Sequence, residues 1–256
     1  MPLTPSNLVL TELDAGIFRI VMNRPEKKNA LTVQMYSDLA AAIVQAEADP
    51  EVRVMLIYGA DDSFTAGNDL KDFLESPPAD ENSPVFRFMK TIGAARKPIV
   101  AAVVGHAVGI GTTMLLHCDL VYAGMHATFM LPFINLGLCP EAASSYLLPR
   151  LAGHHRAAEL LLLGQPFSSE LALEMGLVNE ICADSEVVPY AEEQARKIAD
   201  KPTSSVLVTK ALLKRSRSDS VQRAISEEAD LLVKQLSTPE AIQALRAFLE
   251  RRRPGR

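Results

Sequence analysis

A single glutamate, Glu141, stands in a long apolar stretch and is the first candidate for chemistry. It is the only acidic or basic side chain between His126 and Arg150, and its neighbours in LGLCPEAASSYLLP (136–149) are apolar or small. Taking a carboxylate out of water costs free energy unless a partner or a reaction makes use of it. Proton transfer is one interpretation. The other is that Glu141 caps the helix predicted after it, where a carboxylate is favourable.

Two glycine-rich turns indicate a second kind of chemistry, the stabilisation of a negatively charged oxygen. The segment Ser63–Phe73 follows a predicted strand, and Gly105, Gly109 and Gly111 lead from another strand into a helix. Unpaired backbone N–H groups point outward at such junctions. The spacing G-x-x-x-G-x-G matches neither the dinucleotide fingerprint nor a P-loop. Each turn alone is compatible with a purely structural role, but together they could offer two N–H donors to one oxygen.

Composition excludes several classes of function. The chain has 256 residues, 48% of them hydrophobic, so it can form one domain with a large aliphatic core, with or without an appendage. A net charge of −5 argues against a nucleic-acid-binding protein, whose surface would be basic. The cysteines Cys118, Cys139 and Cys182 lie far apart without a ligand motif. We therefore expect free thiols in a reducing compartment and no metal site.

No targeting or membrane segment is expected. The first residues, MPLTPSNLVLTELDAG, have neither a basic start nor a long apolar run, which argues against a signal peptide. No stretch approaches the roughly 20 consecutive apolar residues of a membrane span. The sequence therefore predicts a cytoplasmic protein without a membrane partner.

Alternating strands and helices are predicted through the first two thirds of the chain. Two β-like runs, 7–13 and 16–23, are separated by Asp14–Gly16, which predicts a hairpin. Thr32 is expected to cap a helix that runs to Asp49, because apolar residues recur there at helical spacing. Further strands are predicted for 52–60, 97–105 and 119–124, and helices for 85–95 and 111–118. The nearly continuous apolar strands are typical of a sheet covered on both faces.

The last third of the chain is predicted to be helical. Helices are expected for 168–176, 185–200, 204–215, 221–236 and 239–252. We therefore predict an α/β core over residues 1–195 and a C-terminal helical region over residues 196–256. Terminal helices with so many apolar residues need a partner surface, either in the same subunit or in a neighbouring one.

Three segments carry a family resemblance: FTAGNDLKDF, KPIVAAVVGHAVGIGTTMLLHCDLVYA and LPFINLGLCPEAASSYLLPRLAG. In this order they resemble the crotonase (enoyl-CoA hydratase/isomerase) superfamily, from NRPEKKNAL near the start to FLERRR at the end. The resemblance implies an α/β spiral of ββα units with a C-terminal helical part that forms trimers, or hexamers as dimers of trimers. It also implies an acyl-CoA substrate, whose thioester oxygen would lie between the N–H groups of Ala66 and Ile110. No cofactor is implied beyond the CoA of the substrate.

The resemblance also distinguishes between reactions. Hydratases of this family use two glutamates, but this chain has Thr113 and Phe133 at the matching positions. The Δ3,Δ2-enoyl-CoA isomerases of β-oxidation have a single glutamate at the position of Glu141, and GNDL, GxAVGI and PEAASSY match that subgroup. The resemblance thus implies that Glu141 moves a proton from C2 to C4 of the acyl chain. Many members have glycine at the position of Ile110, so this larger side chain is expected to reshape the pocket.

The resemblance further implies a set of CoA-binding residues: Lys27, Ala66, Gly67, Asn68, Asp69, Leu70, Ile110, Phe248 and Arg251. Lys27, with Lys28, could equally be a solvated surface lysine, and Phe248 and Arg251 could belong to an ordinary basic helix end. Other crotonase-type reactions remain open, namely weak hydration, thioester hydrolysis or a dehalogenase-like reaction. Aromatic residues make up only 5% of the chain, which argues against an aryl substrate. A non-catalytic acyl-CoA-binding protein is the alternative outside enzymes.

Overall fold

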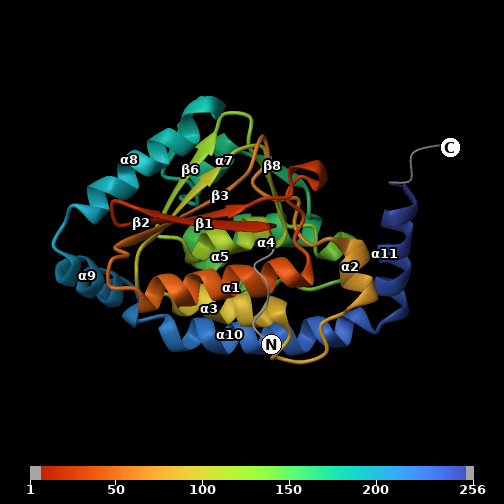
Figure 1. Ribbon diagram of the computed structural model, residues 1–256. Helices are drawn as coiled ribbons and strands as arrows, with labels where there is room; N and C mark the ends of the chain where they lie inside the picture. The colour runs from red at the N-terminus through yellow and green to blue at the C-terminus, as the bar shows by residue number, and fades with distance from the viewer. Residues whose placement is uncertain (1–6, 252–256) are drawn as a thin grey trace.

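The computed structural model describes residues 7–251 and contains two β-sheets surrounded by helices (Figure 1). In the described part, six strands form the larger sheet in the order β1-β2-β3-β4-β6-β9. These strands are β1 (Val9–Asp14), β2 (Ile17–Met22), β3 (Val54–Gly59), β4 (Ile99–Val103), β6 (Leu120–Gly124) and β9 (Glu180–Cys182). Within this larger sheet, β1 and β2 pair antiparallel and all the other neighbours pair parallel. The chain therefore crosses over between each later pair of neighbouring strands.

The chain repeats a strand–strand–helix unit, which confirms the predicted ββα spiral. Strand β4 is followed by β5 in the smaller sheet and then by a helix, and β6 is followed in the same way by β7. After β3, Thr65 makes an isolated parallel bridge to Ala107 of β5 in place of a full strand. The smaller sheet consists of β5 (His106–Val108), β7 (Thr128–Met130) and β8 (Pro166–Ser168).

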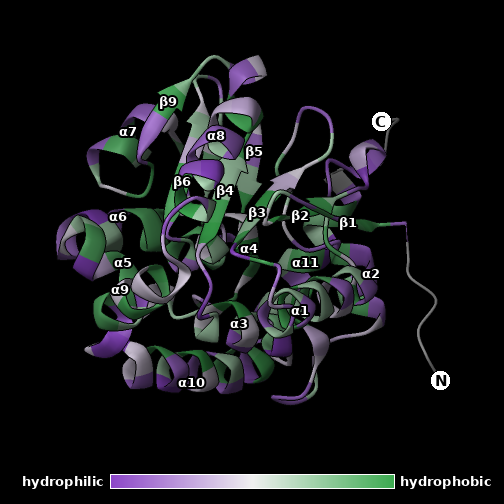
Figure 2. Cartoon of the chain, turned by 60° about the vertical axis from the view of Figure 1, so that its left-hand side comes forward, coloured by the Kyte–Doolittle hydropathy of each residue, from purple (hydrophilic) through white to green (hydrophobic). Residues whose placement is uncertain are grey.

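Both faces of the larger sheet are covered, as the apolar strands predict. In β3, Leu56 packs toward α8 (Val187–Ala199), whereas its neighbours Met55 and Ile57 pack toward the other side. That side is covered by α1 (Val33–Ala48) and α3 (Pro84–Ala94). Figure 2 shows hydrophobic colour concentrated on the strands, while the outer helices show both colours. The larger hydrophobic core therefore lies between the sheet and α1 and α3.

Two local predictions at the start of the chain are confirmed. The hairpin between β1 and β2 turns through Ala15 and Gly16, which both have positive φ (49° and 80°), as a two-residue type I′ turn requires. The helix α1 begins after Thr32, whose hydroxyl accepts a hydrogen bond from the N–H of Met35 at 3.2 Å.

The remaining helices connect the sheets and form the C-terminal part. They are η1 (Pro25–Lys27), α2 (Leu70–Glu75), α4 (Ile110–Thr113), η2 (Met114–His117), η3 (Ile134–Leu136), α5 (Ser144–Ala152), α6 (His154–Leu163), α7 (Ser169–Glu174), η4 (Asp184–Glu186), α9 (Thr203–Arg215), α10 (Ser218–Leu236) and α11 (Pro239–Arg251). Helix α10 packs against α3 and α5, and α11 contacts η3 and α2 (Figure 1).

The predicted boundary between the α/β core and the helical region, at residue 195, stays a prediction and lies inside α8. Within residues 7–251, no helix has the length and apolar character needed to cross a membrane.

Candidate active site

Glu141 lies buried in the turn that connects η3 to α5, with only 3% of its surface exposed. The next two residues, Ala142 and Ala143, both adopt left-handed backbone conformations, with φ of 56° and 58°. At the start of α5, the carboxylate of Glu228 accepts from the N–H groups of Ala143 and Ser145. Glu141 accepts from the N–H of Ser144 through its backbone carbonyl, and its side chain makes no cap hydrogen bond. The helix-capping interpretation of Glu141 is therefore wrong.

The carboxyl group of Glu141 has the properties of a buried proton acceptor. Its Oε1 has no hydrogen-bond partner among the described residues. Burial raises its pKa to about 8, and the negative charge of Glu228 adds to this effect. A carboxyl group whose pKa lies this close to neutrality can both take up and return a proton under ordinary conditions.

The backbone that carries Glu141 is held from two other elements. His117 of η2 donates from Nε2 to the carbonyl oxygen of Ala142 at 2.7 Å. Burial lowers the pKa of His117 to about 4, so the imidazole donates as a neutral ring. From α10, Glu228 accepts hydrogen bonds from the N–H groups of Ala143 (2.6 Å) and Ser145 (3.0 Å) and from the Ser145 hydroxyl. The backbone that follows Glu141 is therefore held by η2 and by α10.

The two glycine-rich turns lie against each other. Thr65 pairs with β5, since its N–H donates to the carbonyl of His106 at 2.8 Å and its own carbonyl accepts from Val108 at 3.1 Å. A Cβ atom on Gly67 would lie 2.6 Å from the carbonyl oxygen of Val108, and one on Gly111 would lie 2.6 Å from Cγ2 of Thr65. Glycine is thus required at both positions by close approach of the turns.

The hydrogen bonds of these turns correct one of the predicted oxyanion donors. The N–H of Ala66 donates to the carbonyl oxygen of Lys28 at 2.9 Å, so it is already engaged, which contradicts its predicted role. Two residues later, the N–H of Asn68 has no acceptor within the described chain. The N–H of Ile110 is likewise without an acceptor there, because it opens α4. The available donors are therefore on Asn68 and Ile110.

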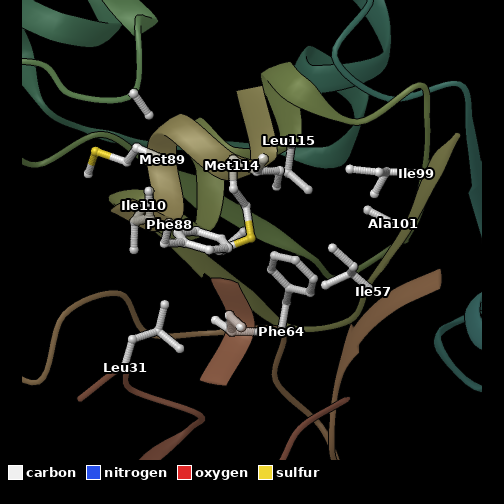
Figure 3. Close-up of a cluster of buried hydrophobic side chains, with 14 of the residues drawn as sticks. Leu31, Ile57, Phe64, Phe88, Met89, Ile99, Ala101, Ile110, Met114 and Leu115 are labelled. Carbon is white, nitrogen blue, oxygen red and sulfur yellow. The ribbon is translucent and has the colours of Figure 1, made fainter. Parts of the chain in front are cut away.

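The side chain of Ile110 is buried in the larger hydrophobic core. It is 1% exposed and belongs to the core cluster that includes Leu31, Phe88 and Met114, as Figure 3 shows. That Ile110 reshapes the pocket stays a prediction.

Tyr36 connects Glu141 with the first glycine turn. Its hydroxyl donates to Oδ1 of Asn68. Burial raises the pKa of Tyr36 well above its usual value, and the charge of Glu141 contributes to this increase. The phenol is therefore neutral and lies within electrostatic reach of Glu141. Tyr36 thus contacts the Asn68 turn directly, and the charge of Glu141 acts on it.

The two positions that carry glutamates in hydratases are occupied by uncharged residues. Thr113 lies in α4 with no exposed surface, and its hydroxyl has no partner in the described part of the chain. Phe133 precedes η3 and is 6% exposed. Its ring lies next to the second glycine turn, since its Cε1 is 4.0 Å from where a Cβ on Gly109 would lie. An aromatic ring thus occupies the place of one carboxylate.

The predicted CoA-binding residues at the N-terminal side lie on two adjoining loops. Leu31 donates to the carbonyl of Gly67 at 2.8 Å and accepts from the N–H of Asp69 at 2.9 Å. The carboxylate of Asp69 binds Arg24 at 2.7 Å and caps α2, which begins at Leu70. These contacts give the Asp69 side chain a structural role.

The other predicted CoA-binding residues are at η1 and in α11. Lys27 ends η1 and is exposed to solvent. Phe248 is half-buried in α11, the helix that contacts α2 of the same chain. The side chain of Arg251 lies outside the described residues. Binding of CoA by all these residues stays a prediction.

Sequence reasoning did not identify Glu228 or Tyr36 as part of the site. Glu228 had a detectable signal, because it falls on the apolar stripe of α10 that includes Val221, Ile225 and Leu232. A glutamate on the buried stripe of a helix needs a partner, as Glu141 does. Tyr36 had no such signal, since an aromatic residue on a buried helix face is ordinary.

The chain is similar to known proteins over nearly its whole length. The family model for enoyl-CoA hydratase/isomerase matches residues 12–255. Enoyl-CoA delta isomerase 2 of Rattus norvegicus is 36% identical over 250 residues, which are 95% of this chain, and the match spans 64% of the rat protein. The 1,2-epoxyphenylacetyl-CoA isomerase of Escherichia coli (strain K12) is 32% identical over 253 residues, covering 96% of this chain and 97% of that protein.

A solved structure shows the same fold. The structure of Pseudomonas aeruginosa OdaA superposes with a TM-score of 0.93 at 48% sequence identity, covering 95% of this chain and 99% of that chain. Because the superposition covers nearly all of both chains, the two proteins share both sheets and the C-terminal helices. With the family model matching almost the whole chain, the protein belongs to the enoyl-CoA hydratase/isomerase family and has the crotonase fold.

Proposed function

We propose that the protein is a Δ3,Δ2-enoyl-CoA isomerase in which Glu141 is the only proton-transferring residue. The observation that carries this proposal is the buried carboxyl group of Glu141, which has an unpartnered oxygen and a pKa raised to about 8. Membership of the family supports an acyl-CoA thioester as substrate. The isomerase name of the rat relative agrees with the reaction.

The reaction requires one base and one oxyanion site. The carboxylate of Glu141 takes a proton from C2, and the electron pair of that C–H bond moves through the thioester to its oxygen. The N–H groups of Asn68 and Ile110 would stabilise the resulting enolate oxygen, a contribution of about 10²–10³ in rate for each donor. The dienolate then accepts the proton from Glu141 at C4, which leaves the double bond between C2 and C3 and restores the carboxylate.

Efficient hydration is not expected from this site. Adding water across a double bond needs a base for the water and an acid for the carbon. The residues at the two hydratase positions, Thr113 and Phe133, can supply neither. Loss of acid–base assistance alone costs about 10²–10⁴ in rate.

The test compares two substrates with the purified protein. We expect 3-enoyl-CoA to be converted to 2-enoyl-CoA, followed by the absorbance of the conjugated thioester. We expect hydration of 2-enoyl-CoA to be at least about 10² slower. Hydration as fast as isomerisation would contradict the proposal, and binding of acyl-CoA without turnover of either substrate would support a non-catalytic protein instead.

A further inference from the structure

The C-terminal helix α10 contributes a buried carboxylate to the turn that carries Glu141. Glu228 is only 6% exposed although it is charged, and it lies more than 80 positions from the turn in the chain. Its Oε2 accepts from the N–H of Ala143, and its Oε1 accepts from the N–H and hydroxyl of Ser145. Both oxygens of Glu228 are therefore engaged by the residues that directly follow Glu141.

These hydrogen bonds fix the backbone in a conformation that it would not adopt freely. Ala142 and Ala143 both have positive φ, a left-handed conformation that is unfavourable for a residue with a Cβ. The bonds to Glu228 begin at the second of these residues and end at the first turn of α5. Glu228 thus holds the segment whose geometry determines where the Glu141 side chain points.

We propose that Glu228 is a positioning residue for Glu141, holding the left-handed turn from α10 and keeping a fixed negative charge near the proton-transferring carboxyl group. This inference rests on the proposed function, in which Glu141 is the base. Glu228 itself does not contact the substrate in this proposal.

The different surroundings of the two carboxyl groups determine which of them is ionised. Burial raises the pKa of Glu228, but its three hydrogen-bond donors favour the charged form and oppose that increase. Glu141 has an oxygen without any donor. The pair therefore shares its protons unequally, with the negative charge on Glu228 and the more strongly held proton on Glu141.

Three other titratable groups close to the turn are neutral near pH 7, and the charge of Glu227 acts on Glu228 rather than on Glu141. Burial raises the pKa of the Cys139 thiol to about 11 and lowers that of His117 to about 4, and the Tyr36 phenol is also raised. Glu228 is thus the group in the described structure whose charge acts on Glu141. Removing that charge should make Glu141 easier to ionise.

The experiment compares Glu228→Gln with Glu227→Gln, the same change one residue away on the exposed side of α10. Two quantities are measured for each: kcat/KM for 3-enoyl-CoA as a function of pH, and the titration of Glu141 by NMR with ¹³C-labelled glutamate. In Glu228→Gln we expect the titration midpoint of the Glu141 carboxyl group to fall by about one pH unit. We also expect the plateau of kcat/KM to fall about 10- to 100-fold, because the base is misplaced. Glu227→Gln should resemble the wild type in both.

A third variant separates charge from position. Glu228→Asp keeps the charge but withdraws it by one methylene, so we expect an unchanged midpoint for Glu141 and a plateau lowered about tenfold or more. This variant also decides the question if Glu228→Gln does not fold. A wild-type plateau in Glu228→Asp would then overturn the positioning role.

The two proposals can fail separately. An unchanged midpoint of Glu141 together with a wild-type plateau in Glu228→Gln would overturn the role of Glu228. If the wild type does not isomerise 3-enoyl-CoA, the proposed function fails, while a lowered NMR midpoint in Glu228→Gln still supports the coupling of the two carboxyl groups. In that case an unchanged midpoint would overturn the coupling as well.

Discussion

At the scale of single residues, the burial of Glu141 is costly for folding and useful for proton transfer. A carboxyl group with an unpartnered oxygen and a pKa raised to about 8 destabilises the folded protein whenever it is ionised. Such perturbed groups gather at functional sites because catalysis requires a proton affinity that water would not give them. Tyr36 and His117 are neutral and add no charge near Glu141. The raised pKa of Glu141 is therefore due to burial and to the charge of Glu228.

The first prediction concerns Glu141→Gln. The amide keeps the size of the side chain but cannot accept the C2 proton, so we expect isomerase turnover to fall by about 10²–10⁴ or more. Affinity for acyl-CoA, measured by calorimetry, should stay within about twofold because the N–H groups of Asn68 and Ile110 are untouched. Wild-type turnover in this variant would remove Glu141 from the mechanism.

The second prediction concerns pH. Glu141 must be deprotonated to act as a base, so kcat/KM should be half its maximum near pH 8, reach a plateau about one pH unit higher and fall as the pH decreases further. The measurement is the rate of 3-enoyl-CoA conversion at a range of pH values. A decrease of kcat/KM only near the usual pKa of a glutamate would contradict the raised pKa of Glu141.

A control for this prediction needs no turnover. The folded pKa of Glu141 is raised above its unfolded value, so the folded state loses stability as the pH rises from about 4.5 to about 8. Glu141→Gln removes this loss. Its melting temperature should therefore exceed that of the wild type by more at pH 9 than at pH 5, and an equal difference at both values would indicate that Glu141 titrates normally.

At the scale of elements, helix α9 is attached to the core by an unusual residue. Lys210 is its buried residue, and its ammonium group donates to Asp119 at 2.6 Å and to the carbonyl of Lys97 at 2.7 Å. The same carboxylate oxygen of Asp119 accepts from the N–H of Ile99, at the start of β4. One ion pair therefore connects α9 to the centre of the larger sheet.

The third prediction follows from this ion pair. Lys210→Ala leaves the carboxylate of Asp119 and the carbonyl of Lys97 without their donor, so we expect the free energy of unfolding to fall by about 1–3 kcal/mol. Urea denaturation measures the loss. Arg215→Ala removes an exposed cation from the same helix and should change stability by less than about 0.5 kcal/mol. Equal effects of the two changes would show that the ion pair is not what attaches α9.

At the scale of the whole molecule, α9 presents an apolar face to solvent. Val208, Leu212 and Leu213 are exposed by 58%, 58% and 70%, while Lys210 of the same helix is buried. A helix that buries a lysine and exposes three apolar side chains is incomplete as part of an isolated chain. We therefore propose that this face packs against a second copy of the chain, in a trimer or in a hexamer formed by two trimers.

The fourth prediction tests this assembly. Light scattering at micromolar concentration should show a trimer or hexamer for the wild type. Leu213→Glu places a charge on the apolar face and should shift the population toward monomers without unfolding the protein. Val44→Glu, at another exposed apolar residue, 58% exposed in α1, should keep the wild-type mass. A monomeric wild type, or an unaffected Leu213→Glu, would contradict assembly through α9.

Much of the fold could be predicted from the sequence because the signals are local. The hairpin at Ala15 and Gly16, the Thr32 cap of α1 and the apolar strands all follow from interactions within a few residues. The unusual position of Glu141 was visible for the same reason, since its neighbours in the chain are apolar. The short strands β5 and β7 to β9 escaped prediction because three residues carry almost no periodic signal.

The tertiary structure alone decided how the site is arranged. The sequence could not show that Lys28 engages the N–H of Ala66 and leaves that of Asn68 available, because this hydrogen bond joins loops that are distant in the chain. Nor could it show that the carboxylate of Glu228, rather than that of Glu141, binds N–H groups at the start of α5. Hydrogen bonding and desolvation depend on which groups meet in space, and local propensity contains no information about partners 40 or 80 residues away.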